Sequence, residues 1–453
     1  MTTMTSTNLL VQPGSGTQSP DSLAFEPDNK AWGTMIGKYQ DSVLAIKTVS
    51  RFGGGQGTAW VVEKEDMGNG LFRHWCITNA HVVDDELNQE MYYSVFVNNQ
   101  EFYEPVPAHV QGVDHVNDVA VVWFDSRIIL EPMPVDETAK VFKGDEILVI
   151  GNQQGEGVIP SLGNVNNVDV YGWSAVEAFQ DDTSALPGNS GSPAINAQGR
   201  VVGLHNSGRR GVNGMGYNIL ISPVMESYRS MRKNGFVVHG RVGEYSGDWV
   251  TQDKLELLGV QGYANGLVLG YLPQWHAFYR AGVRSGDVLL GYGNRPLPTN
   301  EDIDPVTSFF VHQPKQCASV TIAREGKIKT VKVRIGSYEE KQRKILETQY
   351  GYAFAEVDRF FMQDEFNVDV EPGGLALIDQ GDGLATGVLT SLNNTPVGTV
   401  TEAQEAIDSA TGPYILLSYV FYIQGRVQQS LIQLNNANYV APSNSSLENN
   451  SKK

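Results

Sequence analysis

Short runs rich in valine and isoleucine, each bounded by turn-forming residues, constrain the fold of this chain more than any other feature. β-branched residues favour strands, and Gly, Asn and Asp between the runs supply the turns that connect them. The clearest runs are residues 42–49, 58–62, 93–97, 146–151 and 200–204. Their length and regular spacing indicate an all-β barrel domain in the first half of the chain.

A glycine-flanked serine occurs in residues 186–193, which read LPGNSGSP. Gly188 and Gly191 let the backbone take positive φ, so the Ser190 hydroxyl and nearby N–H groups can face one small space. A serine held in this way is suited to act as a nucleophile beside its own oxyanion hole. The same composition also forms ordinary surface turns, so this motif alone leaves both interpretations open.

A nucleophilic serine needs a histidine to take its proton and an acid to orient that histidine. His81 stands where the apolar run 76–83, CITNAHVV, breaks into a short polar segment, and Asp118 opens the apolar run 116–124. An unpaired buried carboxylate is costly, so Asp118 must either cap its strand or serve a partner. For His81 considered alone, a hydrogen-bonded core histidine is the competing interpretation.

Three motifs together carry a family resemblance: TNAHVV around His81, NDVAVV around Asp118 and PGNSGSP around Ser190. Through them the chain, from about residue 32 to about residue 434, resembles the HtrA/Deg family of serine proteases. The order His, Asp, Ser is also that of chymotrypsin-type double barrels. The resemblance implies a mainly β fold, with six-stranded antiparallel barrels at about 37–124 and 141–225 and two small α+β PDZ-like domains after them.

The resemblance also implies roles for individual residues. His81 would be the general base, Asp118 its orienting acid and Ser190 the nucleophile that forms an acyl-enzyme. The N–H groups of Gly188 and Ser190, with Asn189 between them, would form the oxyanion hole. The implied activity is ATP-independent cleavage of unfolded or damaged proteins. The alternatives are a PDZ-containing binding scaffold or a chaperone-like holder with a dormant protease domain.

One departure from the family concerns the substrate pocket. Ser192 replaces the usual glycine two residues after the nucleophile, and His205 follows fifteen residues after it. This pairing resembles the glutamyl endopeptidases, whose histidine at this place contacts an acidic substrate side chain, a charge-assisted contact. Those enzymes carry threonine five residues before the nucleophile, whereas this chain has Ala185 with Ser184 beside it. The family's preference for small aliphatic residues is therefore favoured, with an acidic preference as the alternative.

The chain after the barrels contains an internal repeat, in which residues 287–297 align with residues 387–397. Residues 281–289 resemble the AGL-x-x-GD-V-I-L core of PDZ domains. The expected organisation is a disordered segment at 1–30, a trypsin-like protease domain at 31–228, a linker at 229–247, PDZ domain 1 at 248–337, a degenerate PDZ-like domain 2 at 338–435 and a disordered tail at 436–453.

PDZ domains bind an extended peptide by strand addition, and backbone N–H groups receive its terminal carboxylate. In the first copy, Leu257, Leu258, Gly259 and Val260 best match this carboxylate loop and its following strand. The second copy is shortened at residues 381–385, which fits a structural or assembly domain. Residues 401–410 fit a helix packed on its sheet, with Ala403, Ala406 and Ile407 on one face.

Composition excludes several function classes. A net charge of −18 over 453 residues argues against nonspecific nucleic-acid binding, and no run approaches the roughly 20 apolar residues of a transmembrane helix. The first basic residue is Lys30, so no secretory signal is visible, which favours a cytoplasmic location over a periplasmic or organellar one. Cys76 and Cys317 are expected to be buried thiols.

The expected partners are unfolded protein or peptide substrates, with no cofactor and no metal. The family resemblance implies a homo-oligomer, a trimer or a multiple of trimers, assembled through the N-terminal part of the protease domain. Trp32 and Tyr39 are candidate aromatic contacts between subunits, and packing inside one barrel explains them equally well.

Overall fold

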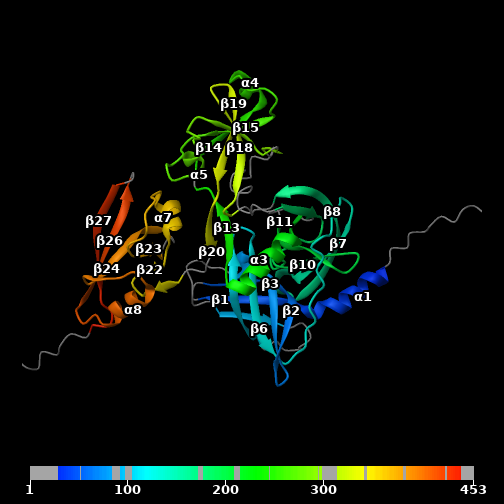
Figure 1. Ribbon diagram of the computed structural model, residues 1–453. Coiled ribbons are helices and arrows are strands. Elements are labelled where there is room, and N and C mark those ends of the chain that lie inside the picture. The colour runs from blue at the N-terminus through cyan, green and yellow to red at the C-terminus, as the bar shows by residue number, and fades with distance from the viewer. Residues whose placement is uncertain are drawn as a thin grey trace, which may run out of the picture.

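A computed structural model describes residues 29–50, 53–83, 92–96, 105–171, 177–208, 215–243, 245–293, 295–297, 314–340, 344–380, 384–423 and 426–439. Within these residues the chain forms two closed barrels followed by two smaller sheet-containing domains (Figure 1). The mainly β double-barrel fold that the sequence predicts is confirmed. The expected disordered ends, residues 1–30 and 436–453, lie outside the described residues except for residues 29–30 and 436–439.

The first barrel closes in the strand order β1-β2-β3-β6-β5-β4. Alternation along these strands points Leu44, Ile46 and Val122 into the barrel, where they are fully buried. Antiparallel neighbours pair throughout, which lets short turns connect most of them. The strands are β1 Val43–Ser50, β2 Gly53–Gly68, β3 Leu71–Thr78, β4 Tyr92–Phe96, β5 Val106–Asp114 and β6 Val119–Ser126.

The second barrel closes in the order β10-β11-β12-β9-β8-β7. Its strands are β7 Glu146–Asn152, β8 Val158–Tyr171, β9 Glu177–Asp181, β10 Pro193–Asn196, β11 Val201–Gly208 and β12 Gly216–Leu220. One apolar cluster joins the two barrels, with Trp60 and Ile77 from the first packed together with Leu148 and Ile150 from the second. This shared core packs one barrel directly against the other.

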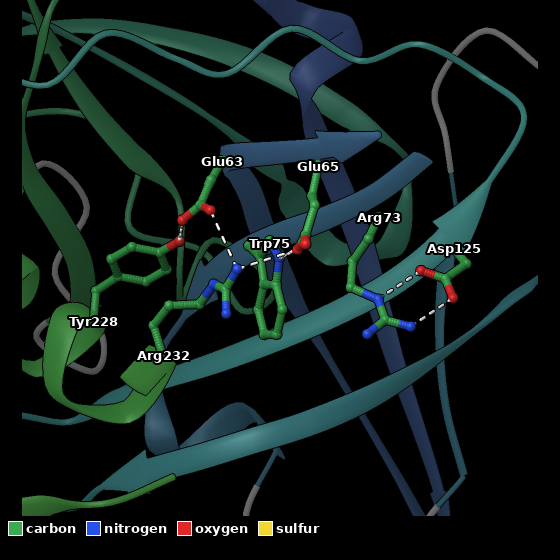
Figure 2. Close-up of polar contacts among 7 residues, drawn as sticks. All are labelled: Glu63, Glu65, Arg73, Trp75, Asp125, Tyr228 and Arg232. Atoms are coloured by element: carbon green, nitrogen blue, oxygen red, sulfur yellow. Dashed lines mark hydrogen bonds and ion pairs between the residues drawn. The ribbon is translucent and has the colours of Figure 1, made fainter. Parts of the chain in front are cut away.

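Helices α1 and α3 pack against the two barrels. Helix α1, Asn29–Tyr39, packs partly buried Trp32 and buried Tyr39 against the core between the barrels. Packing within one chain therefore accounts for Tyr39. Helix α3, Ile221–Asn234, lies on the first barrel, where Tyr228 and Arg232 contact Glu63 (Figure 2).

The segment 229–247 is not the linker that its polar composition predicts. Residues up to Asn234 continue helix α3, which ends on Gly235 in the left-handed conformation that favours glycine. Strand β13, Val237–Arg241, follows and pairs with β20, Gly336–Glu340, across the expected boundary at residue 337. The chain therefore enters and leaves the first PDZ-like domain through one two-stranded ribbon (Figure 1).

The two small domains repeat one sheet pattern at an offset of one hundred residues. Gly291 pairs with Pro296 in the first, and Ser391 pairs with Pro396 in the second. The first contains β14 Gly247–Thr251, α4 Gln252–Leu257, β15 Asn265–Leu269, α5 Ala277–Arg280, β16 Val288–Tyr292, β17 Arg295–Pro296, β18 Cys317–Arg324 and β19 Lys327–Arg334. The internal repeat found in the sequence is thus a repeat of structure.

The second domain contains β21 Ile345–Glu347, β22 Tyr352–Ala355, α7 Arg359–Phe366, β23 Leu375–Asp379, β24 Ala385–Leu392, β25 Thr395–Pro396, α8 Val400–Asp408, β26 Tyr414–Ile423 and β27 Arg426–Asn435. Helix α8 corresponds to the helix expected at 401–410, and it buries Ala403 and Ile407. Asn436 is buried against the carbonyls of Ala410 and Gly412, so the expected tail begins later than residue 436. Cys317 is exposed, which contradicts its expected burial, because it is the first residue of strand β18.

Candidate active site

His81 and Asp118 meet because their two strands are paired. His81 lies in α2, Ala80–Val83, directly after β3, and Asp118 directly precedes β6. Thr78 of β3 pairs with Ala120 of β6, so the end of one strand lies beside the start of the other. The His81 Nδ1 atom lies 2.8 Å from Asp118 Oδ2, and the His81 N–H donates to Asp118 Oδ1 at 3.0 Å.

Asp118 is held in an unusual backbone conformation, with φ at 50°. Left-handed conformations cost energy for residues with a side chain, so surrounding contacts must maintain this one. Its carbonyl accepts from Asn79 Nδ2 at 2.9 Å, and its Oδ2 accepts from Asn206 Nδ2 at 2.6 Å. These donors orient the carboxylate toward the His81 ring.

The turn that carries Ser190 fits only because glycine occupies two positions. Gly188 and Gly191 have φ of 96° and 88°. A Cβ at Gly188 would lie 2.0 Å from the carbonyl of Asn152, and one at Gly191 would lie 2.0 Å from the carbonyl of Thr58. The turn therefore packs between β2 of the first barrel and β7 of the second, and the Ser190 carbonyl accepts from Thr58 N of β2 at 2.8 Å.

Two N–H groups of this turn are available. The Pro187 carbonyl accepts from Gln154 N at 2.7 Å, and in a planar trans peptide the Gly188 N–H then points the opposite way. Within the described ranges, neither Gly188 N nor Ser190 N donates to a protein acceptor. Asn189 differs, because its N–H donates to Leu186 O at 3.1 Å and its buried side chain donates to a backbone carbonyl.

The Ser190 hydroxyl does not bond to His81 in this structure. Its Oγ donates to the Asn206 carbonyl at 3.0 Å. Asn206 thus contacts two of the three candidate catalytic residues. Its carbonyl accepts from Ser190, and its side-chain amide donates to Asp118. Sequence reasoning missed it, although a polar pair, His205 and Asn206, closing a buried apolar run was a visible signal.

His205 is buried and linked to a charged residue through one amide. Its Nδ1 lies 3.2 Å from Asn218 Oδ1, and Asn218 Nδ2 donates to Asp181 Oδ2 at 2.7 Å. Burial lowers the pKa of the His205 imidazole, and the Asp181 carboxylate opposes this effect. A Cβ at Gly216 would lie 2.9 Å from His205 Cε1, so glycine keeps the space beside the ring open.

The other two expected pocket residues, Ser184 and Ala185, lie in the segment just before the Ser190 turn. Ala185 faces Gly208, where an added Cβ would lie 2.3 Å from the Ala185 Cβ. The N–H of Ser184 donates to Ser161 Oγ at 2.9 Å, which ties this wall to β8. The expected pocket residues therefore lie on both sides of the Ser190 turn in the chain: Ser184 and Ala185 come before it, and His205 follows it on β11.

The expected PDZ carboxylate loop does not have the predicted structure. Leu257 is the last residue of helix α4, and Gly259, with φ of 79°, closes that helix. Val260 is buried rather than opening a strand, and the next strand begins at Asn265. The preceding QDKLEL segment forms a helix that buries Leu255, so the glycine serves as a helix end.

Comparisons with known proteins find relatives of this chain. Residues 57–204 match the family model described as a trypsin-like peptidase domain. A probable periplasmic serine endoprotease, DegP-like, from Rickettsia prowazekii is 31% identical over 50% of this chain and 44% of its own length. A protein of the same description from Pseudomonas putida is 25% identical over 76% of this chain and 74% of its own length.

Solved structures show the same fold. The HtrA-type protease AlgW with decapeptide superposes with a TM-score of 0.55 at 20% identity, covering 68% of this chain and 98% of that one. The double barrel therefore contains a trypsin-like peptidase domain, which the family model matches at residues 57–204. The curated relatives to which the chain is similar are described as DegP-like serine endoproteases.

The match to relatives is partial. The chain spans about half the length of the first curated relatives, 44% and 51%. The names of these relatives describe periplasmic proteins, which gives no support to the expected cytoplasmic location. Among the helices that the structure describes, none combines the length and apolar character needed to cross a membrane.

Proposed function

We propose that this chain is an ATP-independent serine endopeptidase that cleaves unfolded or damaged proteins. His81 is the general base, Asp118 orients it, and Ser190 is the nucleophile. The observation that carries the proposal is the 2.8 Å contact between His81 and Asp118 beside a glycine turn with two N–H groups that have no acceptor among the described residues. These are the parts that acyl transfer requires.

The reaction begins when the Ser190 hydroxyl rotates from the Asn206 carbonyl toward His81. His81 removes the proton as Oγ attacks the substrate carbonyl, and Asp118 stabilises the resulting imidazolium. The N–H groups of Gly188 and Ser190 receive the negative charge on the substrate oxygen. His81 then protonates the leaving amine, and a water activated by His81 releases the acyl group from Ser190.

Digestion of unfolded casein without ATP tests this function. Ser190→Ala should abolish cleavage, since the nucleophilic oxygen is lost. Ser192→Ala is the matched control, because Ser192 lies two residues away with a buried hydroxyl that has no partner among the described residues. Equal digestion by wild type and Ser190→Ala would exclude Ser190 as the nucleophile.

For the substrate pocket, we propose the preference for small aliphatic residues, with an acidic preference as the competing outcome. The His205–Asn218–Asp181 chain is the observation on the side of the second, because Asp181 opposes the lowering of the His205 pKa that burial causes. A peptide library cut at pH 6 decides between them. Equal cleavage after Val and Glu would remove the acidic preference, and selective cleavage after Glu that His205→Gln abolishes would establish it.

A chaperone-like holder with a dormant protease domain is the second candidate. The observation that favours it is the Ser190 hydroxyl bonded to Asn206 rather than to His81. Suppression of aggregation of an unfolded protein by Ser190→Ala would support this role. If Ser190→Ala does not suppress aggregation and wild type digests the unfolded protein rapidly, the results support endopeptidase activity without a holder role.

Regulation, assembly and compartment belong to the same proposal. The first PDZ-like domain binds exposed peptide termini, the second serves structure or assembly, and the protein assembles as trimers or their multiples. A periplasmic location agrees with the names of the relatives. Mass measurement of Ser190→Ala with and without bound peptide tests assembly and ligand binding together.

A further inference from the structure

A buried carboxylate lies four residues before Asp118. Asp114 ends strand β5 and has no exposed surface. Its Oδ1 accepts from Asn117 N at 2.9 Å and from His239 Nε2 at 2.8 Å. Its Oδ2 accepts from Asn117 Nδ2 at 2.9 Å and from Ser227 Oγ at 2.5 Å. In the described part of the chain, no Lys or Arg pairs with Asp114.

The four donors come from three separate elements. Asn117 lies in the turn between β5 and β6, Ser227 lies on α3, and His239 lies on β13. Helix α3 is itself fixed on the barrel, since Tyr228 donates to Glu63 and Arg232 lies 3.7 Å from the centre of the Trp75 ring (Figure 2). His239 is therefore the donor to Asp114 that comes from beyond the barrels and α3.

The turn held by Asp114 leads directly into Asp118. Asn117, which makes two hydrogen bonds to Asp114, is the residue before Asp118, and Asp118 has the strained φ of 50°. A residue in that conformation keeps it only while its neighbours are fixed. If Asp114 loses a donor, its buried charge is less well compensated and the turn can relax. The orientation of the Asp118 carboxylate toward His81 then changes.

We propose that His239 is a positioning residue for Asp118, acting through Asp114 and the Asn117 turn. This inference rests on the proposed function, in which Asp118 orients His81. His239 pairs with Tyr338 of β20 and lies 5.7 Å from its ring centre. The strand that enters the first PDZ-like domain, β13, and the strand that leaves it, β20, thus contact each other at His239 and Tyr338. The attachment of that domain therefore supports the active site.

The test uses the full-length chain with His239→Phe, which keeps a ring beside Tyr338 but removes the donor to Asp114. The pKa of the His81 ring is followed by NMR, alongside kcat and KM on a short peptide. A weakened contact with Asp118 stabilises the protonated His81 ring less, so its NMR titration moves to lower pH and kcat falls by about tenfold, with KM nearly unchanged. The acid limb of the kcat/KM profile moves to lower pH accordingly.

Two further variants separate positioning from general damage. His239→Gln places an amide donor near the position of Nε2 and should restore both the His81 pKa and kcat. His109→Gln removes an exposed histidine of the same strand β5 and should leave both unchanged. If His239→Phe does not fold, His239→Asn takes its place, because its shorter amide cannot reach Asp114.

The outcomes distinguish this inference from the proposed function. An unchanged His81 pKa in the folded Phe or Asn variant overturns the positioning role, as does a Gln variant as defective as Phe. The NMR measurement does not need turnover. If wild type fails to cleave peptides, the proposed endopeptidase activity falls while the His81 pKa still decides whether His239 positions Asp118.

Discussion

Asp118 combines a strained backbone with a fully engaged carboxylate. Its two oxygens accept from the backbone and ring of His81 and from Asn206. A carboxylate can only accept, so a donor facing it is held in one orientation, and Nδ1 of His81 must carry the proton. Nε2 is then the atom free to take a proton from Ser190. Asp118, which the first barrel holds beside Nδ1, thus fixes the tautomer of His81.

Replacing this acceptor by a donor should reverse the tautomer. We expect Asp118→Asn to lower kcat by about 10³- to 10⁴-fold with little change in KM, since an amide can donate to Nδ1 and leave the proton on Nε2. Asp125→Asn is the control, because Asp125 pairs with Arg73 at 2.8 Å on the barrel surface. Steady-state kinetics on a peptide ester measure both. A loss of less than tenfold in Asp118→Asn would contradict the assigned role.

His74 makes the stability of the first barrel depend on pH. It is buried against Phe124 and accepts from Leu130 N at 3.3 Å. Burial, followed by the nearby charge of Lys64, lowers its pKa from 6.5 to about 4. Between these values the unfolded chain takes up a proton that the folded chain excludes. Stability therefore falls as pH decreases from 6.5 to 4, by at most about 3 kcal/mol from this group.

We expect His74→Phe to flatten this part of the stability profile, because phenylalanine cannot titrate. Some stability is lost at pH 7, since the Leu130 N–H loses its acceptor. Urea unfolding followed by tryptophan fluorescence at pH 7 and pH 4.5 measures the difference. His109→Gln should keep the wild-type slope, because His109 is exposed. Parallel profiles for wild type and His74→Phe would rule out His74 as the source.

Helix α3 links the barrel to the ribbon that follows, and its attachment rests on a few side chains. Burial and the Glu63 carboxylate raise the pKa of Tyr228, so its hydroxyl remains a donor to Glu63. Arg232 bonds Glu63 and Glu65 while lying over Trp75. The planar guanidinium can stack and donate at the same time, which lysine cannot do.

Arg232→Ala should therefore lower the unfolding free energy of the protease domain by about 1–2 kcal/mol, and Arg232→Lys should recover only part of it. Arg229→Ala offers a comparison on the same helix, since Arg229 makes a more exposed pair with Glu137 worth about 0–1 kcal/mol. Thermal and urea unfolding measure both variants. Equal losses from the two alanine variants would show that stacking on Trp75 contributes nothing.

At this scale, what could be predicted from sequence depends on how local the signal is. Strands, the α8 helix and the three motifs around His81, Asp118 and Ser190 have local signatures. Strands β13 and β20 pair although they lie about one hundred residues apart in the sequence. The polar composition of residues 229–247 predicted a linker instead. The role of Asn206 was missed because its contact with Ser190 is made by a backbone carbonyl, which any residue type can supply. Leu257 was misplaced because a glycine can end a helix as readily as it opens a loop.

For the whole molecule, the two small domains are attached very differently. Among the residues that the structure describes, the second meets the first through the polar contacts Arg280 to Asp369 at 3.6 Å and Tyr271 to Asn367 at 3.2 Å, on largely exposed side chains. The first is joined to the barrels through the β13–β20 ribbon, whose His239 reaches the buried Asp114. Exposed pairs contribute little, whereas a donor to a buried carboxylate contributes more.

Two truncations follow from this difference. A chain ending at Glu340 retains the complete ribbon, and its kcat on a short peptide should stay within about twofold of the full chain, since the exposed contacts that it loses do not reach Asp118. A chain ending at Gly235 lacks β13 and uncovers Asp114, and its kcat should fall by about tenfold or more. Kinetics and thermal unfolding of both, beside the full chain, measure activity and folding separately. Equal kcat in two folded truncations would mean that the barrels position Asp118 without the ribbon.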